Sequence, residues 1–254
     1  MNIIFMGRKN YAAKMLKWTV EQGINVVYVC TDTQNPDSST KRMADALNVP
    51  IASIGKIEQY VQEHPESIDL VVSYLYWRKI RKTLITLPRY GCINFHPAIL
   101  PDWRGCGGYN IAILNQLSTW GATAHYVDEN IDTGDVIRIY KFNFDYRLET
   151  AYSLEKKTQN IQMSLYKSVI LDVLKHGKLK VTVQDKVQGC YISKQEMIRM
   201  MKIDIDNISA KELDNKIRAF WFPPYNGAGF EIDGKFYTLI NEEILHTLQD
   251  NVIE

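Results

Sequence analysis

Two polar side chains at the end of one predicted strand have the types and spacing for proton-transfer chemistry. The run Cys92–Phe95 is dense in apolar residues, as a buried strand should be, and Asn94 and His96 stand two residues apart at its end. Alternate residues of a strand share a face, so we expect this amide and imidazole to project together. Pro97 should end the strand because it has no N–H to donate. An imidazole suits acid–base work near neutral pH, whereas a polar strand end that merely caps a loop is the alternative.

An acidic loop further along the chain could bring a carboxylate to the same place. The segment Val127–Asp135 carries four acidic residues and a glycine. A simple turn and a calcium-like cluster are two alternatives to that interpretation. The EF-hand pattern fails, since no glutamate stands at the twelfth position counted from Asp128. We therefore expect no metal here, and we expect a carboxylate of this loop to approach His96.

The elements that must position these side chains follow a repeating pattern. Runs rich in β-branched and aromatic residues predict buried strands, and they are Asn2–Met6, Asn25–Thr31, Asp69–Tyr74 and Cys92–Phe95. Between them lie amphipathic stretches such as Tyr11–Gln22, which Gly23 should end. This alternation predicts an α/β, doubly wound (Rossmann-like) and mostly parallel sheet covered on both faces. Later segments continue it, with a helix at Gly107–Gln116, strands at Gly121–Val127 and Asp135–Phe144, and a long helix at Glu149–His176.

The pattern changes after Gly189, which predicts a small C-terminal subdomain. We expect a catalytic domain over residues 1–185 and a subdomain over residues 186–254. In the latter, the sequence predicts one short helix, at about Ser209–Phe220, followed by a β-hairpin. The hairpin turn is Asp233-Gly234, a strong two-residue turn signal.

Composition narrows the class of protein further. A formal net charge of +1 gives no indication of a nucleic-acid or membrane partner. Four cysteines without a CxxC pair argue against zinc and disulfides. The start MNIIFMGRKN is too short for a signal-peptide core, and no apolar run approaches the roughly 18 residues that span a bilayer. These features predict a cytoplasmic protein. The turn after the first strand has a single glycine, Gly7, which disfavours a dinucleotide cofactor.

Taken together, these segments resemble the folate-dependent formyltransferase family. The motif of that family stands here as Asn94-Phe95-His96-Pro97, Leu100-Pro101, Arg104-Gly105 and, later, Asp132-Thr133-Gly134. The resemblance covers about Met1 to Leu179. It departs at Ala98, where many members have serine; nucleotide-sugar formyltransferases tolerate alanine there, so the departure favours that branch.

The resemblance implies roles for three residues. His96 would be the general base that takes the proton of the attacking amine, and Asp132 would orient the imidazole and favour its charged form. Asn94 would donate to the oxyanion of the tetrahedral intermediate. The implied formyl donor is 10-formyltetrahydrofolate, with its pterin held by backbone around Leu75–Ile80 and Val127–Asp132, and no metal is implied. The expected donor-binding residues are Tyr76, Trp77, Arg78, Ile80, Asp128, Asp132 and Gly134, although the aromatic ones could instead pack the sheet edge.

The C-terminal part indicates which amine accepts the formyl group. The segment Ile217–Ala228, with its Trp-Phe-Pro-Pro-Tyr run, and the segment Arg104–Asn110 look like those of sugar-nucleotide N-formyltransferases. Members of that branch formylate an amino-dideoxyhexose on thymidine or uridine diphosphate, for O-antigen or surface polysaccharide biosynthesis. Aromatic faces suit a pyrimidine base, and cations, Arg78 among them, suit a diphosphate. The expected substrate-binding residues are Arg8, Lys9, Lys79, Arg104, Gly107, Tyr109, Asn110, Trp221, Phe222 and Tyr225. The aromatic ones could instead bury the subdomain.

Other acceptors and other activities remain as alternatives. Residues 186–254 hold 8 Lys and Arg against 11 Asp and Glu, a net of −3, which argues against a tRNA acceptor because such a segment repels phosphate. A glycinamide-ribonucleotide type of small-molecule formyltransferase is one alternative, and a hydrolytic or non-catalytic formyl-folate-binding protein is another. The resemblance also implies a homodimer, with Phe220–Tyr237 as its surface. The sugar amine, at position 3 or 4, and the nucleotide carrier stay open.

Overall fold

The computed structural model describes residues 1–31, 37–185 and 187–250. The chain forms two compact units, each built from separate stretches of sequence. The larger comprises Met1–Arg104, Gly121–Tyr140 and Gln159–Gly189, and the smaller comprises Gly105–Trp120, Lys141–Thr158 and Cys190–Glu254. The expected domain boundary falls at Lys186, which lies outside the described residues, so that boundary stays a prediction.

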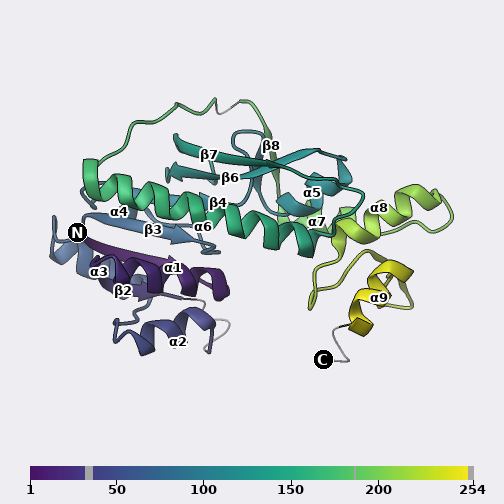
Figure 1. Cartoon of the computed structure of the whole chain (residues 1–254), viewed down its shortest axis with the longest axis horizontal. Helices are drawn as coiled ribbons and strands as arrows, with labels where there is room; N and C mark the ends of the chain where they lie inside the picture. The colour runs from purple at the N-terminus through teal and green to yellow at the C-terminus, as the bar shows by residue number, and fades with distance from the viewer. Residues whose placement is uncertain (32–36, 186, 251–254) are drawn as a thin grey trace. The chain divides into compact units, whose positions relative to one another are not determined.

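A six-stranded sheet in the order β2-β1-β3-β4-β6-β7 organises the fold (Figure 1). Strand β1 pairs in parallel with β2 and β3, and β3 pairs in parallel with β4, whereas β4 and β6 are antiparallel. The prediction of a mostly parallel α/β sheet is therefore confirmed. The strands are β1 (Asn2–Gly7), β2 (Asn25–Cys30), β3 (Leu70–Tyr74), β4 (Cys92–His96), β6 (Thr119–Tyr126) and β7 (Val136–Asn143).

Helices cover both faces of this sheet, as a doubly wound fold requires. Side chains of β1 alternate between two buried clusters, with Ile3 and Phe5 in one and Ile4 and Met6 in the other. The first cluster also takes residues of α1 (Lys9–Glu21), α2 (Ser39–Ala46) and α6 (Ala151–His176). The second takes residues of α3 (Ile54–Glu63) and α4 (Lys82–Thr86).

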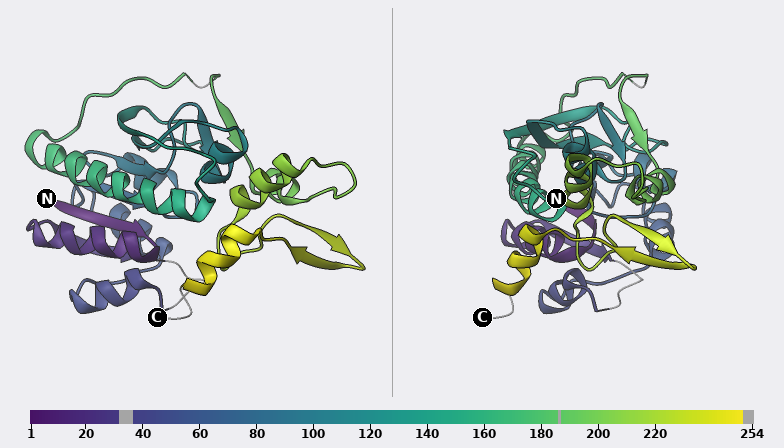
Figure 2. Two further views of the ribbon diagram at one scale, coloured as in Figure 1. Left: turned by 45° about the vertical axis from the view of Figure 1, so that its right-hand side comes forward. Right: turned by 90° about the vertical axis from the view of Figure 1, so that its right-hand side faces the viewer.

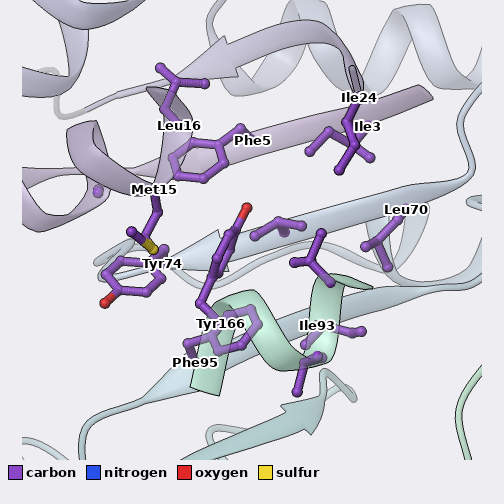
Figure 3. Packing of buried hydrophobic residues seen from close by; sticks show 14 of the residues in the cluster. Ile3, Phe5, Met15, Leu16, Ile24, Leu70, Tyr74, Ile93, Phe95 and Tyr166 are labelled. Atoms are coloured by element: carbon purple, nitrogen blue, oxygen red, sulfur yellow. The ribbon is translucent and has the colours of Figure 1, made fainter. Parts of the chain in front are cut away.

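Tyr166 of α6 is the centre of the first cluster (Figure 3). Its ring lies 4.8 Å from that of Phe95, 5.6 Å from that of Tyr74 and 6.4 Å from that of Phe5, centroid to centroid. The buried hydroxyl of Tyr166 lies 2.6 Å from Thr19 Oγ1 of α1, so its polar end is satisfied. These contacts fix α1 and α6 against the ends of β3 and β4.

The smaller unit contains the helices and hairpin of the C-terminal part (Figure 2). Its elements are α5 (Gly108–Leu114), β8 (Cys190–Ile192), α7 (Lys194–Met201), α8 (Ala210–Phe220), β9 (Gly229–Ile232), β10 (Lys235–Thr238) and α9 (Glu242–Asp250). The short strand β5 (Trp103–Gly105) stands where the chain passes between the units. The predicted hairpin is confirmed, and both turn residues have positive φ, 49° at Asp233 and 74° at Gly234.

The prediction of a single helix after Gly189 was wrong, because α7 and α9 flank α8. Helix α7 begins at a capping box in which Ser193 and Glu196 each bond the other's backbone N–H. That S-x-x-E spacing was the available signal for a helix start. In the part of the chain that the structure describes, no helix is long and apolar enough to cross a membrane.

Candidate active site

Three polar side chains form a row across neighbouring strands of the sheet. Asn94 of β4 is in register with Ser73 of β3 on one side and with His125 of β6 on the other. Ser73 Oγ donates to Asn94 Oδ1 at 2.7 Å, and Asn94 Nδ2 donates to His125 Nε2 at 3.1 Å. Because the hydroxyl and the imidazole bond opposite ends of the amide, its orientation is fixed from both sides.

His125 has a defined tautomer in this row. Its Nδ1 lies 2.8 Å from the carbonyl oxygen of Tyr126, which can only accept, so Nδ1 carries a hydrogen. The lone pair is then at Nε2, where Asn94 donates. These two contacts hold the imidazole of His125 in a fixed orientation. The Asn94 amide nitrogen carries two hydrogens, and the bond to His125 uses only one of them.

The side chain of His96 lies beside an acidic one. Its Nδ1 is 3.5 Å from Asp132 Oδ2, and the other oxygen of that carboxylate is 3.6 Å from His125 Nε2. The carboxylate thus approaches His96, as the sequence predicts, at distances that suit an ion pair better than a hydrogen bond. The side chains of His96 and Asp132 are only 9% and 11% exposed, so their mutual interaction is weakly screened.

Both ring nitrogens of His96 face acceptors. Nε2 lies 2.9 Å from the carbonyl oxygen of Trp103 and therefore donates to it, which leaves Nδ1 to take up a further proton. A proton held at Nδ1 would sit beside the Asp132 carboxylate and turn the contact into an ion pair. The arrangement is therefore suited to accept and retain a proton.

The loop that presents Asp132 has a constrained backbone. Asp132 itself has φ of 55°, a left-handed conformation that few non-glycine residues adopt. Asp128 Oδ1 accepts from the backbone N–H of Asn130 at 3.0 Å and from Thr133 Oγ1 at 2.6 Å. A Cβ on Gly134 would lie 1.8 Å from the Tyr126 carbonyl oxygen, so only glycine fits there. Two of the expected donor-binding residues, Asp128 and Gly134, thus shape this loop.

Contacts that the sequence pattern does not indicate hold the carboxyl end of β4. Thr123 Oγ1 donates to the carbonyl of Ala98 at 2.7 Å and accepts from the N–H of Leu100 at 3.1 Å. Gln162 of α6 donates from Nε2 to the Phe95 carbonyl at 2.6 Å. Thr123 lies opposite His96 in the strand register, which only the strand pairing reveals.

The two segments expected to hold a pterin share one buried cluster. Ile80 is buried in the second cluster, and Tyr76 and Val127 pack against it. The Tyr76 hydroxyl lies 3.6 Å from Cys30 Sγ, and burial raises the pKa of both groups, so both stay protonated near neutral pH. Trp77 and Arg78 are exposed, and the guanidinium lies 4.7 Å from the indole centroid.

The cations expected to bind a diphosphate have different environments. Arg8 Nε donates to the Leu75 carbonyl at 3.1 Å, at the first residue of the expected pterin segment. Lys9 has φ of 67°, and Lys79 is exposed. Arg104 is buried, and its Nη2 donates to the Asp185 carbonyl at 2.8 Å. Their predicted roles toward substrate remain predictions.

Within the smaller unit, three of the expected substrate residues form an aromatic cluster. The rings of Tyr109 and Phe222 stack at 6.4 Å with an interplanar angle of 15°, and Tyr225 lies 6.0 Å from Phe222. The ring of Tyr152 contacts that of Phe222 edge-on at 5.9 Å. The sequence did not predict this contact, because the helical pattern around Tyr152 does not indicate its partner. Trp221 accepts from the Tyr152 N–H through its carbonyl at 3.1 Å.

Two further predicted residues position α5 within this unit. Asn110 Nδ2 donates to the Ala219 carbonyl at the end of α8, at 2.8 Å. Gly107 has φ of 72° at the start of α5, and a Cβ there would lie 2.1 Å from Met197 Sδ of α7. The hydrogen bond of Asn110 and the positive φ of Gly107 explain why these two residue types stand there.

A doubly wound sheet thus brings an amide, an imidazole and a carboxylate together beside the carboxyl end of β4, an arrangement that suits an α/β enzyme. The family model described as formyl transferase matches residues 1–170. The chain belongs to this family and is a formyltransferase.

Similar proteins agree on the family but differ in the acceptor that their names state. A methionyl-tRNA formyltransferase of Lachnospira eligens is 28% identical over all of this chain and 81% of its own length. A 4-N formyltransferase from Francisella tularensis superposes with a TM-score of 0.81 at 23% identity, over 95% of this chain and 97% of that one. An N-formyltransferase from Helicobacter canadensis, solved with folinic acid and dTDP-3-aminofucose, superposes with a TM-score of 0.71 at 21% identity, over 94% and 88% of the chains.

Proposed function

We propose that this protein transfers the formyl group of 10-formyltetrahydrofolate to the amine of a nucleotide-linked amino-dideoxy sugar. The aromatic cluster of Tyr109, Phe222 and Tyr225 carries the choice of acceptor, because flat faces suit the pyrimidine base of such a carrier. The similar structure with dTDP-3-aminofucose supports this choice, and so does the similarity to a 4-N formyltransferase.

The reaction breaks the bond between the formyl carbon and the folate nitrogen and forms an amide bond to the sugar nitrogen. The attacking amine must lose a proton, and His96 can take it at Nδ1, where the Asp132 carboxylate stabilises the charged ring. Negative charge develops on the formyl oxygen, and the remaining N–H of Asn94 can donate to it. A proton then returns to the departing folate nitrogen, so the enzyme ends in its starting state.

The residues around Tyr76 and Val127 fit a reduced folate. The aromatic face of Tyr76 and the buried side chain of Ile80 offer apolar contact, and the two segments share one cluster. The second segment ends at Asp132, whose carboxylate lies 3.5 Å from Nδ1 of His96, so this segment reaches the side chains at the carboxyl end of β4. A formyl group held there would lie near the proton-transfer centre.

Formylation of methionyl-tRNA is the second candidate, because several similar sequences carry that name. The charge of residues 186–254, a net of −3 from 8 basic and 11 acidic residues, argues against it. A protein that binds tRNA needs Lys and Arg side chains where it contacts the phosphate backbone.

The proposal is tested by incubating the protein with 10-formyltetrahydrofolate and a panel of thymidine- and uridine-linked amino sugars, with product mass as the readout. We expect one sugar nucleotide to gain one formyl group and the His96→Asn variant to lose at least about 10²-fold in rate, the low end of general-base catalysis. Parallel reactions contain methionyl-tRNA, glycinamide ribonucleotide or no acceptor. Activity confined to one of those acceptors, or release of formate alone, would contradict the proposal.

A further inference from the structure

A buried glutamine that the catalytic set does not include contacts the Asp132 loop. Gln184 is 4% exposed and comes from the segment that follows α6. Its Nε2 donates to the carbonyl of Asp132 at 3.2 Å and to the carbonyl of Gly134 at 2.5 Å. A single amide group thus bonds the backbone on both sides of Thr133.

The surroundings of this amide determine which way it faces. The two loop carbonyls can only accept, so the nitrogen must face them. On the other side, Oε1 accepts from Arg104 Nη2 at 3.4 Å. Only an amide side chain offers two donors to the carbonyls and an acceptor to the guanidinium, and a glutamate of the same length would direct oxygen against oxygen.

The segment that carries Gln184 is itself fixed to the sheet. Val136 and Thr182 exchange backbone hydrogen bonds at 2.9 and 2.8 Å, and the backbone N–H of Gln184 lies 3.4 Å from Asp135 Oδ1. The side chain of Gln184 therefore reaches the loop from a rigid base.

The backbone of the Asp132 loop has a conformation that requires such support. Asp132 is held at φ of 55°, a left-handed conformation that is uncommon in non-glycine residues and persists where surrounding contacts impose it. From that conformation its carboxylate meets His96 Nδ1 at 3.5 Å and His125 Nε2 at 3.6 Å. A loop released from Gln184 would lose this placement.

We propose that Gln184 is a positioning residue for formyl transfer, which acts by holding the Asp132 carboxylate against His96. The proposal rests on the proposed function only for the choice of acceptor in the rate assay. Its central prediction is that replacing Gln184 changes kcat and the His96 resonance only when residue 132 carries a carboxylate.

The test is a double-mutant cycle of Gln184→Met, which keeps length but has no donors, with Asp132→Asn. We expect Gln184→Met to lower steady-state kcat about 10–100-fold, up to the loss that a misplacement of about 1 Å causes, with KM unchanged within about twofold. In the Asp132→Asn background the same change should have no further effect within about twofold. Thr19→Val, which removes a buried hydrogen bond to Tyr166, is the control and should keep kcat. Additive losses, or an unchanged kcat, would overturn the proposal.

A second readout needs no acceptor at all. The ring resonance of His96, assigned by its loss in His96→Asn, is recorded at constant pH without substrates. We expect Gln184→Met to move it and to have no effect on it once Asp132 is Asn. If the wild-type protein formylates no sugar nucleotide, the proposed function is wrong, but the role of Gln184 is still tested by this resonance. A His96 resonance that does not move in Gln184→Met would refute the Gln184 proposal.

Discussion

The orientation of the Asn94 amide depends on side chains of the two neighbouring strands. Ser73 donates to the amide oxygen and His125 accepts from the amide nitrogen. These two bonds fix the plane of the amide and therefore the direction of its second N–H. Without Ser73, a rotated amide would place oxygen where charge develops and would repel it. At the scale of single residues, the geometry of the candidate site is therefore set by cross-strand pairs.

Ser73→Ala should lower kcat about 2- to 10-fold, since one hydrogen bond contributes roughly 0.5–1.5 kcal/mol and 1.4 kcal/mol is tenfold. KM should change little, because the lost bond orients a group that acts in the transition state. Steady-state kinetics with the preferred acceptor would measure this.

Ser67→Ala is the matched control for that change. Ser67 precedes the same strand, and its buried hydroxyl has no hydrogen-bond partner among the described residues. It should keep kcat, and an equal loss in both variants would show that the Ser73 hydroxyl does not orient Asn94.

At the scale of elements, the strands and the long helix could be predicted from sequence, whereas the contacts that complete the site could not. Runs such as Asn2–Met6 have a strong local signature, and β1 differs from that range by one residue. The spacing of Asn94 and His96 likewise requires only local alternation. Ser73 and Gln184 escaped prediction because their partners are set by strand register and by a segment some fifty residues away, which a one-dimensional pattern does not encode.

The Asp132 loop makes a second prediction at this scale. Gly134→Ala would place a methyl group 1.8 Å from the Tyr126 carbonyl oxygen, so the loop or β6 must shift. We expect the unfolding free energy to fall by about 1–3 kcal/mol, as for other overpacked sites. Urea unfolding measures this change.

Gly55→Ala is the opposite case within the same unit. Gly55 lies in α3, and nothing stands within 4 Å of a Cβ added there. Alanine should raise the unfolding free energy by about 0.4–1 kcal/mol, because it restricts the unfolded chain and favours helix. Equal effects at the two glycines would mean that the close approach at Gly134 is not rigid.

At the scale of the whole molecule, burial of titratable groups couples folding to alkaline pH. Burial raises the pKa of the Cys30 and Cys92 thiols above the ordinary 9.0 and that of the Tyr76, Tyr126 and Tyr166 phenols above the ordinary 10.0. These groups come from both faces of the sheet, so no single region carries the effect.

The sign of this coupling follows from proton counts. Above about pH 9 the unfolded chain releases protons that the folded chain still holds, so the unfolding free energy should fall as pH rises, by up to about 1.4 kcal/mol per pH unit for each such proton. Below the ordinary pKa values these groups are protonated in both the folded and the unfolded state, so their full contribution to the unfolding free energy is present. The unfolding free energy, measured with urea from about pH 7 to 10.5, should therefore show a plateau and then a decline.

Cys92→Val keeps an apolar buried side chain without a proton to release. It should therefore make the decline shallower, while its effect on the unfolding free energy near pH 7 reports packing alone. A free energy that stays level or rises above pH 9, or a decline equally steep in Cys92→Val, would mean that these groups ionise as readily in the folded protein as in the unfolded chain.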